Sequence, residues 1–278
     1  MNISIVGEKI TSRSGIGALM EDMGNATSLN KDILMLGGGN PAHIPEVQKY
    51  FRSSMENILQ DGSAFEKAIG NYDPPVGNIE FIDAVAKLLN KEYGWNVTSK
   101  NIALTSGSQM AFFILFNIFA GTYKDGTEKN ILFPLTPEYI GYCDVGLADD
   151  LFVAQKPVIE HEDEHIYKYH IDFDKLVIDE SIGAICVSRP TNPTGNVLTD
   201  SEIAKLNEIA GKKKIPLIID SAYGMPFPDI VFTEAKAAWN ENIILCLSLS
   251  KLGLPSVRTG IIVANEGLRD LCSCRVQP

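Results

Sequence analysis

Hydrophobic residues recur along this chain with two different spacings. Apolar side chains repeat every three or four positions after Pro45 and again across 79–89, which predicts two amphipathic helices. From Asn101 onward, short apolar runs bounded by turn residues alternate with helical stretches; the runs cover 102–104, 131–133, 151–154, 184–187, 216–219, 243–247 and 260–264. Several runs are apolar throughout, which is typical of strands covered by helices on both faces. We therefore expect an α/β fold with a mostly parallel, doubly wound sheet covered by helices.

The composition argues against several classes of protein. The 278 residues include 24 Lys and Arg against 35 Asp and Glu, for a net charge of −11. This excess of acidic groups argues against a nucleic-acid partner, because contacts to the phosphate backbone need clustered cations, and against anionic membrane surfaces. The longest apolar stretch, 110–120, is too short to span a bilayer, and the N-terminal residues show no apolar signal segment.

Length and cysteine usage bear on the number of domains and on the cellular compartment. The chain is long enough for one large α/β domain or about two domains. Its five cysteines are scattered, which indicates reduced thiols in a cytoplasmic protein. Cys272 and Cys274 form a C-x-C pair with no histidine or second cysteine pair nearby, so we expect no metal site.

Polar residues follow the apolar runs, where the strands of the expected sheet end. In open α/β sheets, ligands bind outside the carboxyl ends of the strands. These positions hold Gly107, Ser108 and Gln109 after 102–104, Asn192 after 184–187, Asp220 and Tyr223 after 216–219, and Ser248, Ser250, Lys251 and Arg258 after 243–247. Taken singly, these groups have plain structural interpretations: a tight turn before a helix, a rigid proline-rich turn, a helix cap and a surface lysine.

Together, the same groups fit the chemistry of one cofactor. Small residues before a helix present backbone N–H groups to a phosphate. A lysine beside them is a candidate amine for an imine with an aldehyde. A carboxylate at a neighbouring strand end would keep a ring nitrogen protonated. An amine, a carboxylate, hydroxyl donors and an anion site in this arrangement indicate pyridoxal phosphate (PLP).

Longer motifs carry the same pattern along most of the chain. They read S-G-S-Q, P-E-Y-I-G-Y, N-P-T-G, I-I-D-S-A-Y and S-L-S-K-L-G-L-P-S-V-R-T-G. In this order the chain resembles the fold-type-I, class-I PLP-dependent aminotransferases, over roughly residues 14–266. With G-G-G-N-P-A-H-I-P added, it is most similar to the branch of that family that acts on valine and pyruvate.

The resemblance implies a fold and a division of the chain. The fold would be the PLP-dependent transferase-like large domain, without the family's small C-terminal domain. Residues 1–60 would form an N-terminal arm and first helix, 61–266 the PLP-binding large domain, and 267–278 a truncated or divergent tail. The family's arginine for the substrate α-carboxylate belongs to that small domain and finds no match here.

The resemblance also implies roles for single residues. Lys251 would hold the cofactor as an imine and then move the proton between Cα and C4′. Asp220 would pair with the pyridinium nitrogen. Asn192 and Tyr223 would reach the 3-oxygen of the ring, so that Lys251, Asp220 and Tyr223 form the catalytic set. Tyr139 would stack on the ring; its alternative is a core aromatic.

Further residues would hold the phosphate and admit the substrate. The phosphate ligands would be Gly107, Ser108, Gln109, Ser248, Ser250 and the fork of Arg258. Tyr72 resembles the family's tyrosine that crosses a homodimer interface to the neighbouring subunit's phosphate. Gly38, together with Asn192, would lie against the substrate, although a flexible turn explains this glycine almost as well.

The implied activity is transamination between a small aliphatic amino acid, valine or alanine, and a 2-oxo acid, pyruvate or 2-oxoisovalerate. It would follow a ping-pong course through pyridoxamine phosphate. Two alternatives stay open. Another PLP-dependent reaction, C–S lysis or decarboxylation, can use the same fold. The chain could also be a non-catalytic PLP-binding remnant, because no arginine for the substrate carboxylate is present.

Overall fold

The computed structural model describes residues 2–12, 14–29, 34 and 40–273. The helices of this part are α1 (Ile5–Thr11), α2 (Gly15–Leu29), α3 (Pro45–Gln60), α4 (Ala64–Gly70), α5 (Ile79–Tyr93), α6 (Ser108–Phe119), α7 (Asp200–Lys213) and α8 (Glu266–Ser273). Short 3₁₀ turns occur at η1 (Ser99–Asn101), η2 (Ile140–Asp144) and η3 (Pro255–Val257). None of the described helices is long and apolar enough to cross a membrane.

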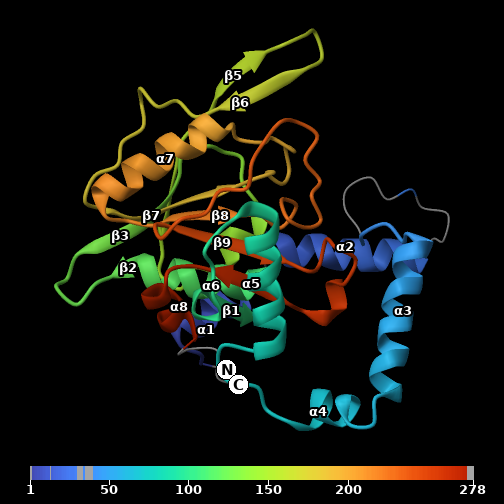
Figure 1. Ribbon diagram of the computed structural model, residues 1–278. Helices are drawn as coiled ribbons and strands as arrows, with labels where there is room; N and C mark the ends of the chain where they lie inside the picture. Colours follow the sequence, from blue (N-terminus) through green and yellow to red (C-terminus); the bar gives the residue numbers. More distant parts are fainter. Residues whose placement is uncertain (1, 13, 30–33, 35–39, 274–278) are drawn as a thin grey trace.

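A single large sheet forms the centre of the molecule (Figure 1). Its strands are β1 (Ile102–Thr105), β2 (Gly121–Thr122), β3 (Glu128–Phe133), β4 (Phe152–Ala154), β7 (Ile182–Ser188), β8 (Leu217–Asp220), β9 (Ile243–Ser248) and β10 (Gly260–Val263). They lie in the order β1-β10-β9-β8-β7-β3-β2, with β4 also paired to β3. Each of the seven expected apolar runs forms a strand, so the strand pattern read from the sequence is confirmed.

Pairing within the sheet is mostly parallel, as expected. β4, β3, β7, β8 and β9 run parallel to one another, whereas β10 is antiparallel to both β9 and β1, and β2 is antiparallel to β3. A parallel return needs a crossover of a dozen or more residues, usually through a helix. Only 249–259, which contains no α-helix, connects β9 to β10, so the chain turns back antiparallel. This short connection carries Lys251 and Arg258.

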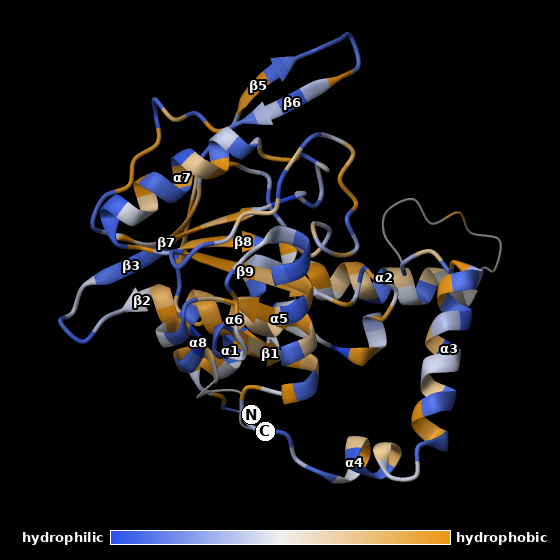
Figure 2. Cartoon of the chain, viewed as in Figure 1, coloured by the Kyte–Doolittle hydropathy of each residue, from blue (hydrophilic) through white to orange (hydrophobic). Residues whose placement is uncertain are grey.

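Alternate residues of the strands supply two separate cores. On β7, Ile185 and Val187 face the core under α5 and α7, whereas Ala184 and Cys186 face the core under α6. The hydropathy colouring in Figure 2 shows the apolar character concentrated in these strands and in α6. Because both faces of the central strands are covered, polar side chains can reach solvent only beyond the strand ends.

Outside the sheet, two features matter for the site. The acidic segment 160–165 lies in a hairpin formed by β5 (Val158–His161) and β6 (Tyr167–His170). The helix predicted after Pro45 is α3, but it buries no residue, and in Figure 1 it lies with α4 to one side of the sheet. The N-terminal α2, which the sequence did not predict, contacts η2 near the carboxyl edge of the sheet.

Candidate active site

A cavity of about 620 Å³ opens at the carboxyl edge of the central strands. Its walls come from the loops after β1, β3, β7, β8 and β9 and from α2. Ten of the residues proposed from the sequence line it: Ser108, Gln109, Tyr139, Asn192, Asp220, Tyr223, Ser248, Ser250, Lys251 and Arg258. A volume of this size suits a small organic ligand.

Three proposed residues stand apart from this lining. Gly107 lies directly beneath the Arg258 guanidinium: a Cβ on this glycine would be 2.3 Å from Nη2. Tyr72 is 97% exposed and lines a different cavity, of about 800 Å³, beside Ser106 and Thr259. Gly38 lies outside the described residues.

One end of the cavity is suited to an anion. Gly107 has φ +89° and ψ 159°, a backbone conformation confined to glycine, and it leads directly into the first turn of α6. The unpaired N–H groups of that turn and the guanidinium of Arg258 share this end of the cavity. Gln109 contributes only its backbone there, because its side-chain amide donates to the carbonyl of Gly141 at 2.7 Å.

At another wall lies the carboxylate of Asp220. This residue ends β8 and is 8% exposed. Its Oδ1 accepts from the backbone N–H of Ala222 at 2.9 Å, and its Oδ2 accepts from the hydroxyl of Tyr142 at 2.6 Å. Burial raises the pKa of Asp220, while these two hydrogen bonds act in the opposite direction. Among the described residues it forms no ion pair, so no cationic side chain of this part of the chain contacts the buried carboxylate.

Behind Asp220 lies a polar chain that the sequence interpretation missed. Tyr142, 2% exposed, has its Oη 3.0 Å from Ser188 Oγ, and Ser188 Oγ lies 2.5 Å from Glu138 Oε2. The N–H of Ser188 also donates to Glu138 Oε1 at 2.9 Å. Burial raises the pKa of Glu138 to about 8, the charge of Asp220 acts in the same direction, and the Ser188 hydrogen bonds oppose it. The signal was present: P-E-Y-I-G-Y contains both Glu138 and Tyr142, but only Tyr139 was singled out.

Lys251 enters the cavity from the connection between β9 and β10. It is half-buried, and its Nζ lies 5.3 Å from the centre of the Tyr223 ring. The aromatic ring of Tyr139 lies at the same cavity and packs edge-on against Tyr142, with ring centres 5.4 Å apart. The amine, the carboxylate and the two tyrosines therefore share one space.

A buried arginine fixes the loop that carries Asn192. Arg189 is 6% exposed, and its guanidinium donates to the carbonyls of Leu198 and Lys236, each at 2.7 Å. Its third contact is an ion pair with Asp200 at 2.6 Å. Because a buried guanidinium is costly without such partners, these contacts hold the loop in one place.

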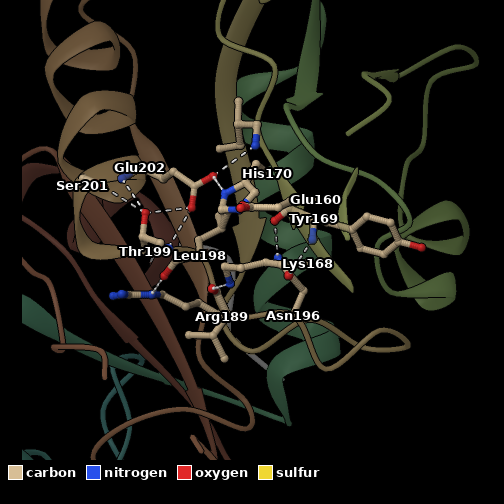
Figure 3. Close-up of polar contacts among 12 residues, drawn as sticks. Glu160, Lys168, Tyr169, His170, Arg189, Asn196, Leu198, Thr199, Ser201 and Glu202 are labelled. Carbon is tan, nitrogen blue, oxygen red and sulfur yellow. Dashed lines mark hydrogen bonds and ion pairs between the residues drawn. The ribbon is translucent and has the colours of Figure 1, made fainter. Parts of the chain in front are cut away.

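Contacts from the β5–β6 hairpin hold the far side of the same loop (Figure 3). Asn196 exchanges two hydrogen bonds with the backbone of Tyr169, both at 3.1 Å. His170 lies between Glu160, at 2.9 Å, and Glu202 at the start of α7, at 3.2 Å. The hairpin and α7 therefore support the loop as one polar network (Figure 3).

Comparison with known proteins identifies the family. A sequence model of the family described as aminotransferase class I and II matches residues 31–276. Valine–pyruvate aminotransferase of Escherichia coli is 54% identical over 266 residues, which are 96% of this chain and 63% of that protein. The chain thus spans less than two thirds of the length of this relative.

Solved structures agree with the sequence match. A putative amino-acid aminotransferase of Psychrobacter arcticum superposes with a TM-score of 0.93 at 47% identity, over 99% of this chain and 67% of the other. The valine–pyruvate aminotransferase of Salmonella typhimurium gives a TM-score of 0.82 at 51% identity, over 94% and 63% of the two chains. Enzymes of this family depend on PLP. On its sequence and its fold, this chain belongs to the class I and II aminotransferase family.

Proposed function

We propose that the protein is a PLP-dependent aminotransferase that exchanges an amino group between valine or alanine and a 2-oxo acid such as pyruvate. One observation carries the proposal: a single cavity joins the amine of Lys251, the buried carboxylate of Asp220 and the anion site at Arg258. The similarity to the valine–pyruvate aminotransferase of Escherichia coli supports the choice of substrates.

The residues of the cavity fit PLP. Asp220 is buried with two hydrogen-bond donors and makes no ion pair with a described side chain, and a protonated ring nitrogen would supply a positive charge beside it. Arg258 and the first turn of α6 would hold the phosphate, with Ser248 and Ser250 beside them. The hydroxyl of Tyr223 and the amide of Asn192 would donate hydrogen bonds to the 3-oxygen of the ring, and Tyr139 would cover one face of the ring.

When bound, PLP supplies an aldehyde for the amino group and a ring that accepts the electron pair of the broken Cα–H bond. Lys251 Nζ would hold the cofactor and, once released by the incoming amino acid, would take the proton from Cα and return it. Asp220 Oδ atoms would keep the proton on the ring nitrogen. Arg258 would fix the cofactor's position, so that Lys251 needs only to move a proton over a short distance.

The cavity wall favours a small aliphatic substrate. From α2, the side chains of Ile16, Leu19 and Met20 line the cavity. Among its described lining residues, Lys251 and Arg258 are the cationic side chains, and both are assigned to the cofactor. An isopropyl or methyl group on the substrate would contact the apolar surface that these α2 side chains form.

We further propose that two copies associate. Tyr72 is almost fully exposed beside the cavity that borders Ser106, so its hydroxyl is available to a second copy. The outward apolar residues Tyr50, Met55 and Leu59 of α3 lie on an arm that the same contact would cover. The division into an arm (1–60), a large domain (61–266) and a tail (267–278) belongs to this proposal.

Purified protein loaded with PLP, given L-valine and pyruvate, tests the activity. We expect 2-oxoisovalerate and alanine in equal amounts, and parallel double-reciprocal plots as the sign of ping-pong kinetics. Ammonia or carbon dioxide without alanine would instead indicate lyase or decarboxylase chemistry. Cofactor absorbance that does not respond to any amino acid would indicate a non-catalytic binding protein. Lys251→Ala is the matched control, which should keep the fold and lose the exchange.

A further inference from the structure

Glu138 and Asp220 are joined by a continuous chain of short oxygen–oxygen contacts. Glu138 Oε2 lies 2.5 Å from Ser188 Oγ, Ser188 Oγ lies 3.0 Å from Tyr142 Oη, and Tyr142 Oη lies 2.6 Å from Asp220 Oδ2. All three separations are within the range of O–H···O hydrogen bonds. The chain therefore consists of three hydrogen bonds between two carboxyl groups.

Counting hydrogens shows that two ionised carboxylates do not satisfy this chain. Three hydrogen bonds need three hydrogens, but Ser188 and Tyr142 supply one hydroxyl hydrogen each, and an ionised carboxylate supplies none. With both carboxylates ionised, Ser188 would donate to Glu138 and Tyr142 to Asp220. The two hydroxyl oxygens would then face each other at 3.0 Å with no hydrogen between them. One additional proton, on either carboxyl group, completes the chain.

We propose that Glu138 and Asp220 share one proton through Ser188 and Tyr142, and that the proton resides on Glu138 whenever Asp220 faces a cation. In that state Glu138 donates to Ser188, Ser188 to Tyr142, and Tyr142 to the ionised Asp220. In the other state Asp220 is protonated and every hydrogen bond runs in the opposite direction: Asp220 donates to Tyr142, Tyr142 to Ser188, and Ser188 to the ionised Glu138. The two states differ by the transfer of one proton across each of the three bonds, so the net charge of the chain stays at −1.

The surroundings favour a single shared negative charge. Burial raises the pKa of both carboxyl groups, and the charge of Asp220 raises that of Glu138 further. Buried Cys186 on β7 is held neutral, because burial raises its pKa well above the ordinary value. Lys251 and Arg258 line the same cavity, together with the phenols of Tyr139 and Tyr223.

This arrangement gives Glu138 a positioning role in the site, and that consequence rests on the proposed function. When a protonated ring nitrogen faces Asp220, the chain presents a hydroxyl hydrogen to Asp220 Oδ2 and keeps this carboxylate ionised. When no cation is present, the proton can move to Asp220 and reduce the cost of its burial. The proton sharing itself is a property of the protein alone.

Carbon-13 NMR of the full chain, labelled in the carboxyl groups of Glu and Asp, tests the inference. The signals are assigned by their loss in Glu138→Gln and Asp220→Asn. Without added cofactor, we expect the two groups together to hold one proton at pH 7. Two ionised groups, or two protonated groups, would overturn the proposal. After saturation with PLP, we expect Glu138 to be protonated and Asp220 to be ionised. An ionised Glu138 with a protonated Asp220 would overturn the assignment of the proton to Glu138.

A variant separates proton sharing from a merely structural contact. Tyr142→Phe removes the middle hydroxyl, so Ser188 is free to donate to an ionised Glu138, and the Glu138 titration should move to lower pH by on the order of one unit. Tyr123→Phe is the control, because the hydroxyl of Tyr123 donates to the backbone carbonyl of Phe119, outside the chain of hydrogen bonds. If Glu138 titrates at the same pH in folded Tyr142→Phe as in the unmodified protein, the proposed chain of hydrogen bonds is contradicted. If PLP fails to bind, the proposed function fails, but the result without cofactor still decides the proton sharing.

Discussion

Replacing Gly107 by alanine separates backbone strain from the binding of an anion. Gly107 has φ +89° and ψ 159°, a region in which residues other than glycine cost about 1–3 kcal/mol. Gly107→Ala should lower the free energy of unfolding by about that amount. The new Cβ would also lie 2.3 Å from Arg258 Nη2. Because Arg258 is exposed and its side chain is long, the guanidinium should move away rather than break the fold.

The displaced guanidinium determines the second expected effect. A hydrogen bond to a charged group contributes about 1.5–3 kcal/mol, so loss of the Arg258 contact should weaken PLP binding about 10- to 100-fold. Urea denaturation followed by circular dichroism measures the first effect, and titration of the cofactor-free protein, followed by cofactor absorbance, measures the second.

A matched glycine supplies the control. Gly94 ends α5 with φ +67°, and a Cβ there would meet nothing within 4 Å. Gly94→Ala should cost about 1–2 kcal/mol of stability through left-handed strain and leave PLP affinity unchanged. If Gly107→Ala bound PLP as tightly as the unmodified protein, the anion site would not lie between α6 and Arg258, and our reasoning would be refuted.

Three further changes test other parts of the structure. Tyr142→Phe removes a hydrogen bond to a buried carboxylate and should lower the free energy of unfolding by about 1.5–3 kcal/mol in urea denaturation, and an unchanged midpoint would count against that bond. Arg189→Ala removes the hydrogen bonds to the carbonyls of Leu198 and Lys236 and the ion pair with the half-exposed carboxylate of Asp200, so we expect a loss of about 1.5–3 kcal/mol by the same assay; a loss under about 1 kcal/mol would show that the loop is held by other contacts. The folded protein keeps the proton of Glu138 up to a pH of about 8, because its pKa there is about 8 against the ordinary value of 4.5, so stability should fall as pH rises between these values. Glu138→Gln should flatten that fall, and equal slopes for the two proteins would contradict the raised pKa.

Much of the fold could be predicted because each strand is marked by its own short run of apolar residues. The strands β7, β8 and β9 are apolar throughout, and each ends in a polar residue: Ser188, Asp220 and Ser248. Parallel strands bring these ends to one edge, so residues far apart in the chain could be assigned to one site before any geometry was known. The antiparallel direction of β10 follows from the length of a connection and not from its composition.

Other parts of the site depend on information that the pattern does not contain. Glu138 lies in the loop after β3, and only its separation from Ser188 shows its part in a buried chain. Tyr139 and Tyr142 are close in sequence, yet only Tyr142 reaches Asp220, because η2 turns it into the core. The wall formed by α2 was missed although Ile16, Leu19, Met20 and Met23 recur at helical spacing, because three glycines in this segment are unfavourable for a helix.

Covalent trapping of the cofactor tests the central claim most directly. Borohydride reduction of the protein with PLP, followed by mass spectrometry of its peptides, identifies the amine that holds the cofactor. We predict one phosphopyridoxyl group per chain, on Lys251, and its loss in Lys251→Ala. Stoichiometric labelling of another lysine, or an unchanged adduct in Lys251→Ala, would contradict the account.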